Sequence, residues 1–170
     1  QGTLTVNAAT NANNNFDFNI NVNNTANLVY NGAEGQNYNI GQNSKVQFGN
    51  GANSANIEFN SGNYNLQGDL NNSSGNTTSF NNSTLTLAAN NYAGGYNING
   101  SQIDLSDGSF SEHTFESLKV NNTELALDIN FENPENSDKL IAVNEGGQVI
   151  INELNILPET GAQDSGENPV

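Results

Sequence analysis

The chain has 170 residues, a net charge of −15 and no cysteine, which excludes a disulfide framework and any site built on thiolates. Three lysines and no arginine are too few to neutralise phosphates, so the composition also excludes binding to nucleic acid or to an anionic membrane surface. Asn is by far the commonest residue type, and because Asn forms helices poorly but tolerates tight turns, we expect short strands joined by turns.

Acidic residues are distributed unevenly along the chain. Residues 1–101 contain four acids and one lysine, whereas residues 102–170 contain fourteen acids and two lysines. Together with the strand pattern, this change predicts four sections. They are first strands at 1–26, Asn-rich coils at 27–108, a section denser in apolar residues at 109–157, and a flexible tail or linker at 158–170.

The first expected strands are short. Leu4-Thr5-Val6 is one, and residues 16–22 alternate strictly between apolar and polar side chains, as a strand with one buried face does. From residue 27 onward a phrase of apolar, polar, apolar, then Asn and Gly recurs. Alternate copies follow at nearly constant steps, with one longer step in the middle, and begin at Leu28, Val46, Tyr64, Leu85, Ile103 and Val120.

A near-constant period of this size is typical of stacked structural units. The two-residue alternation within each copy makes those units β-strands, so we predict an all-β fold, a parallel β-helix (solenoid) with little or no helix. In such a stack, Asn side chains can hydrogen-bond to their copies in the next coil.

Secondary strands are expected between the main copies, which gives each coil two or three strands. They are Tyr38-Asn39-Ile40, Ile57-Glu58-Phe59 and Tyr96-Asn97-Ile98. Turns with positive backbone angles are expected at Asn31-Gly32, Asn50-Gly51 and Asn99-Gly100. Because Asn-Gly also favours hairpins, an antiparallel meander is the alternative, but the constant spacing favours parallel coils.

Residues 67–82 interrupt the rhythm with Asn, Ser, Gly and Thr, and the longest step between copies falls here. We interpret them as a loop that projects from one coil, where solenoids usually carry recognition. An insertion without function is the alternative. The candidate recognition residues are Gln67, Asp69, Asn71, Asn72, Ser73, Ser74, Asn76, Thr77 and Thr78.

After Gly108 further strands are expected at 114–120, 125–131, 139–143 and 148–157, with a turn at Pro134. Signals for chemistry are weak. His113 is the only histidine, and Asp164-Ser165-Gly166 lies in a polar tail, so we predict no catalytic residue. The acids Asp104, Asp107 and Glu112 are close in sequence, but solvated surface acids explain them as well as paired carboxylates of a glycosidase do.

Calcium could bridge acids within residues 128–138, but neither a calcium-binding nonapeptide nor an EF-hand is present, so we predict no metal and no cofactor. Leu157-Pro158-Glu159-Thr160-Gly161 matches the sortase signal of Gram-positive bacteria, yet polar residues follow where an apolar span is needed. Glycosylation sequons such as Asn99-Gly100-Ser101 and Asn121-Asn122-Thr123 are expected by chance in a chain so rich in Asn.

The segment 118–151 carries a family resemblance. It contains Leu118-Lys119-Val120, Leu125-Ala126-Leu127-Asp128-Ile129, Ser137-Asp138-Lys139-Leu140-Ile141 and Gly146-Gly147. This succession resembles the passenger domains of Gram-negative autotransporters of the pertactin and AIDA type. One departure is Ala142, which intervenes before Val143 and shifts the register of the expected strand. Two-partner-secretion adhesins, which share the same shape, are the nearest rival family.

The resemblance implies a right-handed parallel β-helix that is secreted through an outer-membrane barrel and displayed at the bacterial cell surface. It implies a non-catalytic role in adhesion or host contact. The partners would be a host surface protein or glycan, or another copy on a second cell, together with the translocator barrel of the full-length protein. This segment would not insert into a membrane. A carbohydrate-active β-helix enzyme and a sortase-anchored Gram-positive surface protein are the alternatives.

Overall fold

The computed structural model describes residues 2–8, 19–41, 46–70, 72–73, 75–143, 150–151 and 154–157. Within these residues the regular structure consists of strands and one 3-10 helix, η1 (Pro134–Asn136). The strands form three sheets, and all of the strand pairs between described residues are parallel. The all-β prediction is therefore confirmed, and the antiparallel meander is wrong.

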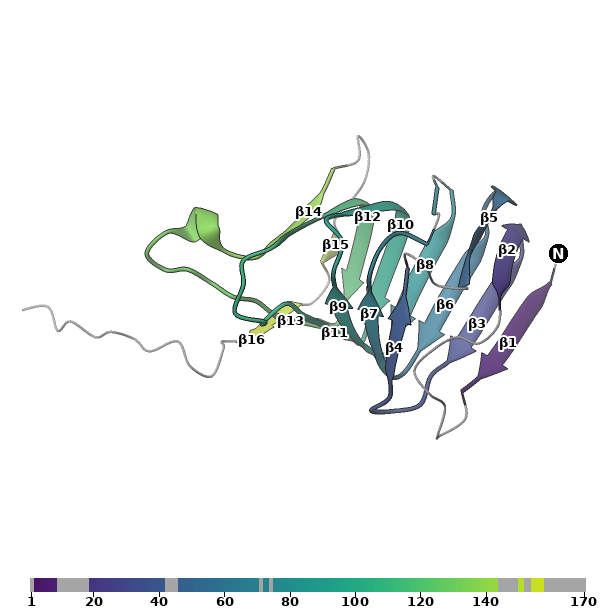
Figure 1. Cartoon of the computed structure of the whole chain (residues 1–170), viewed down its shortest axis with the longest axis horizontal. Helices are drawn as coiled ribbons and strands as arrows, with labels where there is room; N and C mark the ends of the chain where they lie inside the picture. Colours follow the sequence, from purple (N-terminus) through teal and green to yellow (C-terminus); the bar gives the residue numbers. More distant parts are fainter. Residues whose placement is uncertain are drawn as a thin grey trace, which may run out of the picture.

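The largest sheet has eight strands. Its path runs through β1 (Thr3–Asn7), β3 (Asn27–Asn31), β6 (Asn56–Asn60), β8 (Thr77–Asn81), β10 (Asn91–Asn99), β12 (Glu112–Asn121) and β14 (Lys139–Ala142), and β15 (Ile150–Ile151) also pairs with β12. Figure 1 shows these strands side by side from the N-terminal end toward β14.

The second sheet has six strands, and a third has two. The six-stranded sheet contains β4 (Asn37–Ile40), β7 (Asn63–Leu66), β9 (Thr84–Leu87), β11 (Gln102–Asp104), β13 (Thr123–Ala126) and β16 (Leu154–Leu157). The two-stranded sheet pairs β2 (Ile20–Asn24) with β5 (Val46–Ala52). The chain thus passes alternately through the two large sheets, and we call one such passage a level.

The levels differ in length. In the eight-stranded sheet Leu28 pairs with Ile57, Ile57 with Thr78, Thr78 with Tyr96 and Tyr96 with Leu118, so the advance along the chain changes at every level. In the six-stranded sheet Tyr64, Leu85 and Ile103 are aligned, as the sequence predicts.

The predicted alignment is wrong for the other three starts. Leu28 and Val120 lie in the eight-stranded sheet, on β3 and β12, and Val46 lies on β5 of the two-stranded sheet. The physical reason is that every strand with one buried face has the same apolar–polar–apolar pattern. The pattern identifies strands, but it does not tell which sheet a strand joins when the levels vary in length.

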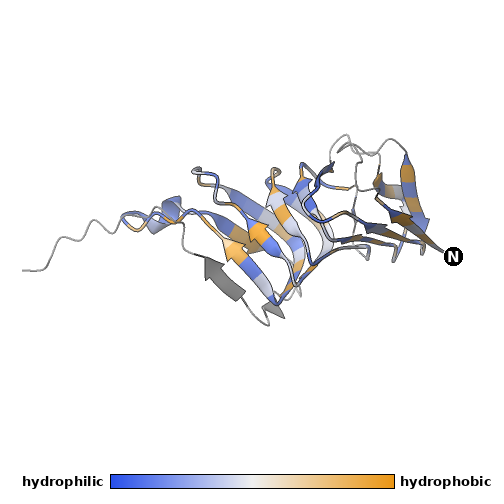
Figure 2. Ribbon diagram, turned by 90° about the horizontal axis from the view of Figure 1, so that it is seen from below, coloured by the Kyte–Doolittle hydropathy of each residue, from blue (hydrophilic) through white to orange (hydrophobic). Residues whose placement is uncertain are grey.

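The core lies on the inward faces of the strands. Side chains on β6, β7, β8 and β10 alternate between buried and partly exposed, and Figure 2 shows the matching alternation of apolar and polar residues. Like residues stack between levels: Phe59 lies on Phe80 with ring centroids 5.2 Å apart, and Tyr38 lies on Tyr64 at 5.2 Å. Such stacks add to the gain from burying each ring.

The predicted Asn-Gly turns have different outcomes. Gly100 has a positive φ of 55° and forms a turn between β10 and β11, as predicted. Gly51 lies inside β5, so no turn forms at Asn50-Gly51. Gly32 follows β3 without a positive φ, and a Cβ there would come within 2.5 Å of the Tyr64 hydroxyl oxygen. Gly32 is therefore needed for close packing rather than for backbone conformation.

The sections and strands expected from the sequence agree with the observed strands only in part. Leu4-Thr5-Val6 lies within β1, but Phe16 and the tail from 158 to 170 are outside the described residues. Both large sheets continue past Gly108, and the expected strand 125–131 ends at Ala126. The segment between β13 and β14, which carries η1, extends away from the sheets in Figure 1. The division into four sections stays a prediction.

Candidate functional site

One corner of the molecule repeats at four successive levels, where the chain turns from the eight-stranded sheet into the six-stranded sheet. The turns are very short, and each begins with a residue of positive φ: Ser61 (59°), Asn82 (50°), Gly100 (55°) and Asn122 (48°). Asn and Gly adopt this left-handed conformation most readily. The repeated turn places equivalent side chains in rows along the corner.

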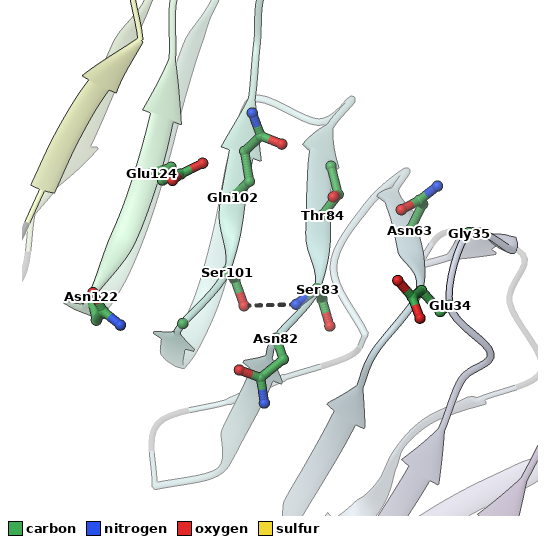
Figure 3. Close-up of a pocket in the computed structure, with 12 residues that line it drawn as sticks. Glu34, Gly35, Asn63, Asn82, Ser83, Thr84, Ser101, Gln102, Asn122 and Glu124 are labelled. Atoms are coloured by element: carbon green, nitrogen blue, oxygen red, sulfur yellow. Dashed lines mark hydrogen bonds between the residues drawn. The ribbon is translucent and has the colours of Figure 1, made fainter.

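The row that faces inward consists of hydroxyl groups. Ser83, Ser101 and Thr123 are buried, and each donates a hydrogen bond to the carbonyl oxygen two residues earlier in the chain, at 2.9, 2.9 and 3.2 Å. Ser101 Oγ also accepts a hydrogen bond from the Ser83 amide at 3.1 Å, which Figure 3 marks. Each hydroxyl group thus adds a second hydrogen bond to a carbonyl oxygen that already accepts from a backbone N–H of the adjacent level.

A row of Asn side chains lies beside the corner, at the ends of the strands of the eight-stranded sheet. The side-chain Nδ2 of each Asn donates to the side-chain Oδ1 of the Asn one level earlier, over distances of 2.7 to 2.9 Å. The row consists of Asn7, Asn31, Asn60, Asn81 and Asn99. This is the amide ladder that the composition predicts. We refer to these five residues as the Asn ladder.

A polar groove with a volume of about 590 Å³ follows the corner. Its lining residues come from several levels and are Glu34, Gly35, Gly62, Asn63, Asn82, Ser83, Thr84, Gly100, Ser101, Gln102, Asn122 and Glu124. Figure 3 shows their side chains around the turns and at the starts of β7, β9, β11 and β13. We refer to this hollow as the corner groove.

The electrostatics of the corner groove are acidic and uncompensated. Glu34 and Glu124 are exposed carboxylates on its wall, and no lysine is among the lining residues. The side chains of Asn82, Gln102 and Asn122 form no hydrogen bond with the part of the chain that the structure describes. Unlike the Asn ladder, these amides are available to a ligand.

The predicted recognition loop does not project as a whole. Asn72, Asn76 and Thr78 are buried, at 7%, 2% and 0% exposure, so their side chains cannot meet a partner. Gln67 and Ser73 are exposed, Asp69 and Thr77 are half-buried, and Thr77 and Thr78 belong to β8. Asn71 and Ser74 lie outside the described residues.

Hydrogen bonds explain why these polar side chains turn inward. Asn76 Oδ1 accepts from the Ala55 amide at 3.0 Å, and Asn76 Nδ2 donates to Ser73 Oγ at 3.0 Å. The Asn72 amide reaches Thr78 Oγ1 at 3.5 Å, and its backbone N–H donates to Asp69 Oδ1 at 3.2 Å. These buried side chains therefore hold the turn in place by internal hydrogen bonds. The composition of the segment alone does not reveal this role.

Burial shifts two pKa values in the same region. The pKa of the Asp69 carboxyl is raised, chiefly because burial penalises its charged form. Hydrogen bonds from the Asn72 backbone N–H and the Tyr96 hydroxyl group act in the opposite direction but do not outweigh burial. The pKa of Tyr96 is raised well above its usual value, first by burial and then by the nearby Asp69 carboxylate. This pair is a structural contact between a loop and the core.

His113 is almost fully buried, at 3% exposure, and both of its ring nitrogens have partners. Nδ1 lies 2.8 Å from the Ala89 carbonyl oxygen, and Nε2 lies 2.9 Å from Ser111 Oγ. A Ser–His contact is one part of a hydrolytic site, but Ser111 Oγ also donates to Asp138 Oδ1 at 2.8 Å. Asp138 thus engages the hydroxyl group that would have to attack a substrate.

The remaining candidate acids bind nearby backbone groups. Asp104 Oδ1 accepts from the Ser106 amide and hydroxyl, and Asp107 Oδ1 accepts from the Ser109 amide at 2.8 Å. Within 128–138, Asp128 and Asp138 are buried and bind backbone amides rather than facing each other across an open site. Among the described residues no group of three potential metal ligands is found. Glu112 is exposed on β12.

The corner groove is the feature that sequence reasoning missed. Its signal is present in the sequence as Asn81-Asn82-Ser83, Asn99-Gly100-Ser101 and Asn121-Asn122-Thr123, each of which also has the form of a glycosylation sequon. In each, the three positions supply the strand-end Asn, the left-handed residue and the inward hydroxyl group. The triplet recurs at three successive levels, so its spacing follows the level length.

Comparison of the chain with protein-family models, with curated proteins and with solved structures finds no match. The resemblance of 118–151 to autotransporter passengers therefore stays a prediction. Of Leu157-Pro158-Glu159-Thr160-Gly161, only the backbone of Leu157 belongs to the described residues. None of the helical structure in the described residues is long and apolar enough to cross a membrane.

Proposed function

We propose that the chain is a segment of a cell-surface or secreted protein, in which it acts as a stiff, non-catalytic scaffold for adhesion or host contact. The proposed architecture is a right-handed parallel β-helix of the autotransporter-passenger kind, exported across the outer membrane. Its partners would be a host surface protein or glycan, or a second copy on another cell. The translocator barrel of the full-length protein would export it.

The observation that carries this proposal is the continuity of parallel pairing from level to level. Every level from β3 to β13 pairs with the next in both large sheets, without a gap. In such an arrangement each level contacts only its neighbours, so the stack can lengthen without limit from a single core. An elongated, repetitive body suits a spacer that carries a binding surface away from a cell.

The interactions between levels favour stiffness. Four hydrogen bonds join the members of the Asn ladder, and each contributes on the order of 1 kcal/mol. Stacked rings reinforce the interior, as in Tyr92 on Phe115 with centroids 4.7 Å apart. None of these contacts involves a charged group, so they hold in a wide range of salt and pH.

The segments that carry the family resemblance coincide largely with strands. Leu118-Lys119-Val120 lies in β12, Leu125 lies in β13 and Lys139-Leu140-Ile141 lies in β14. At the point of departure, β14 ends at Ala142 and Val143 is 60% exposed. The strand therefore stops one residue before Val143, the position at which the resemblance departs from the family pattern.

Surface display is the test of this proposal. Intact cells that produce the full-length protein are treated with proteinase K, and the segment is followed by immunoblot with a periplasmic protein as control. We expect the segment to be lost while the periplasmic protein survives. Protection of the segment until the outer membrane is permeabilised would contradict display at the surface.

Adhesion is tested separately with the purified segment. We expect it to compete with attachment of the producing cells to host cells, in a manner that depends on its concentration. If the segment is displayed but the purified segment leaves attachment unchanged at every concentration, the adhesion role is contradicted and only the scaffold role remains.

A further inference from the structure

The lining of the corner groove repeats from level to level along the stack. Asn63, Thr84, Gln102 and Glu124 occupy equivalent positions at the starts of β7, β9, β11 and β13 and pair in register. Adjacent parallel strands lie about 4.8 Å apart, so these side chains form a row that runs across the strands at that interval. A row of hydrogen-bonding groups at a fixed interval fits a linear ligand whose own groups repeat along its length.

Taken together, the groups that line the corner groove include both donors and acceptors of hydrogen bonds. Asn82, Gln102 and Asn122 present amides, Thr84 presents a hydroxyl group, and Glu34 and Glu124 present carboxylates. Figure 3 shows these side chains around the groove with no hydrogen bond drawn from the three amides. Hydroxyl groups, which donate and accept together, are the ligand chemistry that this mixture matches best.

The charge of the corner groove restricts the ligand further. Two carboxylates and no cation repel sulfated or uronic-acid polymers, and the net charge of −15 acts in the same direction. A cationic peptide would suit the carboxylates, but it would leave the run of amides and hydroxyl groups between them without matching partners. The lining therefore favours an uncharged, hydroxyl-rich chain over either charged class.

We propose that the corner groove binds a linear, uncharged glycan that lies along the stack, across the strands. This inference rests on the proposed function in surface contact and names its ligand class and its site. No aromatic side chain is among the lining residues, so binding depends on hydrogen bonds rather than on ring stacking. Each sugar then adds little, and affinity grows with the number of sugars that contact successive levels.

The test uses the whole segment labelled with nitrogen-15 and titrated in solution. The neutral probes are cellohexaose, xylohexaose and mannohexaose, and the charged probes are hexagalacturonate and hexalysine. We expect at least one neutral hexasaccharide, at up to about 10 mM, to shift the side-chain amide resonances of Asn82, Gln102 and Asn122. The disaccharide of the same linkage should bind several-fold more weakly.

Variants locate the site. Asn82→Gly and Asn122→Gly remove an amide without straining a left-handed position, since Gly100 occupies the equivalent position one level away from each. Each of these, and Gln102→Ala, should weaken binding by about fivefold. The matched control is Asn97→Ala, which removes an amide from β10 of the eight-stranded sheet, outside the groove, and should leave affinity unchanged.

The outcomes are distinguishable. Absence of shifts with all three neutral probes, shifts only with hexalysine or hexagalacturonate, or equal losses in Asn97→Ala would overturn the glycan site. A segment that is displayed and supports attachment but binds none of the neutral probes leaves the proposed function in place and removes this inference. A segment that binds the neutral probes but is not displayed at the cell surface supports the glycan site and contradicts the proposed function.

Discussion

The Asn-rich section, residues 27–108, and the following section, residues 109–143, join their levels by different interactions. In the Asn-rich section, uncharged groups connect equivalent positions. Asn60 donates to Asn31 and accepts from Asn81, and Phe59 stacks on Phe80 directly inside. The Asn contact repeats at the next level, where Asn99 donates to Asn81, because the registers are aligned.

Residues 109–143 rely instead on carboxylates that bind backbone amides distant from them in the sequence. Asp138 accepts from the Ser111 amide at 2.7 Å and from the Asp128 amide at 2.7 Å, and Asp128 accepts from the Gly108 amide at 2.6 Å. Glu116 accepts from the Gly94 amide at 2.6 Å. The contacts of Asp128 and Asp138 hold the connection between β13 and β14, whereas Glu116 binds at the register shift where β10 pairs with β12.

The difference teaches that apolar content and apolar burial are separate properties here. Most of the largest fully buried side chains lie in the Asn-rich section, whereas Phe115 is the one from 109–143. Four large apolar side chains of that section are exposed instead: Phe110, Ile129, Phe131 and Val143. Within the connection 127–138, Ile129 and Phe131 are 41% and 78% exposed, so its apolar residues add little to the core.

The largest expected effect is a loss of stability on removing a buried ring of the Asn-rich section, compared with an exposed ring of residues 109–143. Phe80→Ala removes a ring with 0% exposure from between Phe59 and Tyr64, and we expect a loss of about 3–5 kcal/mol in the free energy of unfolding. Phe131→Ala is the control, because Phe131 is 78% exposed and should change stability by less than about 0.5 kcal/mol. Urea denaturation measures both. Similar losses in the two variants would break the comparison.

The second prediction concerns the carboxylate contacts. Asp138→Ala leaves the amides of Ser111 and Asp128 without their acceptor, and we expect a loss of about 2–4 kcal/mol. Asp107→Ala, which removes an exposed acid bound only to the nearby Ser109 amide, should cost under about 1 kcal/mol. Thermal melts at fixed salt measure the difference. An unchanged melt for Asp138→Ala would show that residues 127–138 are held by other means.

The third prediction concerns a single rung of the Asn ladder. Asn60→Ala removes one donated and one accepted hydrogen bond at a half-buried position, which should cost about 1–2 kcal/mol. Asn97→Ala, which removes no ladder bond, is the matched control and should lie within about 0.5 kcal/mol of the original protein. Equal effects would mean that the ladder contributes geometry without measurable stability.

Much of the fold follows from the sequence because it depends on local alternation. The strands at Tyr38, Ile57, Tyr64, Leu85 and Tyr96 are all present, since their two-residue pattern reports one buried face. The assignment of strands to sheets was only partly predictable. It depends on level lengths that differ even within the six-stranded sheet, and loops set those lengths without an apolar signal.

The candidate site was less predictable for a related reason. Asn72 and Asn76 have the composition of an exposed loop, yet Asn76 is buried because the Ala55 amide needs an acceptor at that point. Which polar residues brace the interior and which remain available, as Gln102 does, is decided by partners on other levels. Those partners are distant in sequence, and composition does not show them.

The smallest expected effect concerns Asp69 in the Asn-rich section, whose pKa is raised. Burial raises the pKa of Asp69 above its ordinary value, so the folded protein binds this proton more tightly than the unfolded chain does. Its contribution to stability is therefore present below the unfolded pKa near 3.8 and is lost as pH rises through the higher folded pKa. Asp69→Asn resembles the protonated form at every pH. We expect the melting temperature of the variant to exceed that of the original protein at pH 7 and the two to converge toward pH 4, because other acids titrate alike in both. A gap that is constant or that widens on acidification would contradict the raised pKa, and Asp69 would then stabilise its loop as Asp138 does.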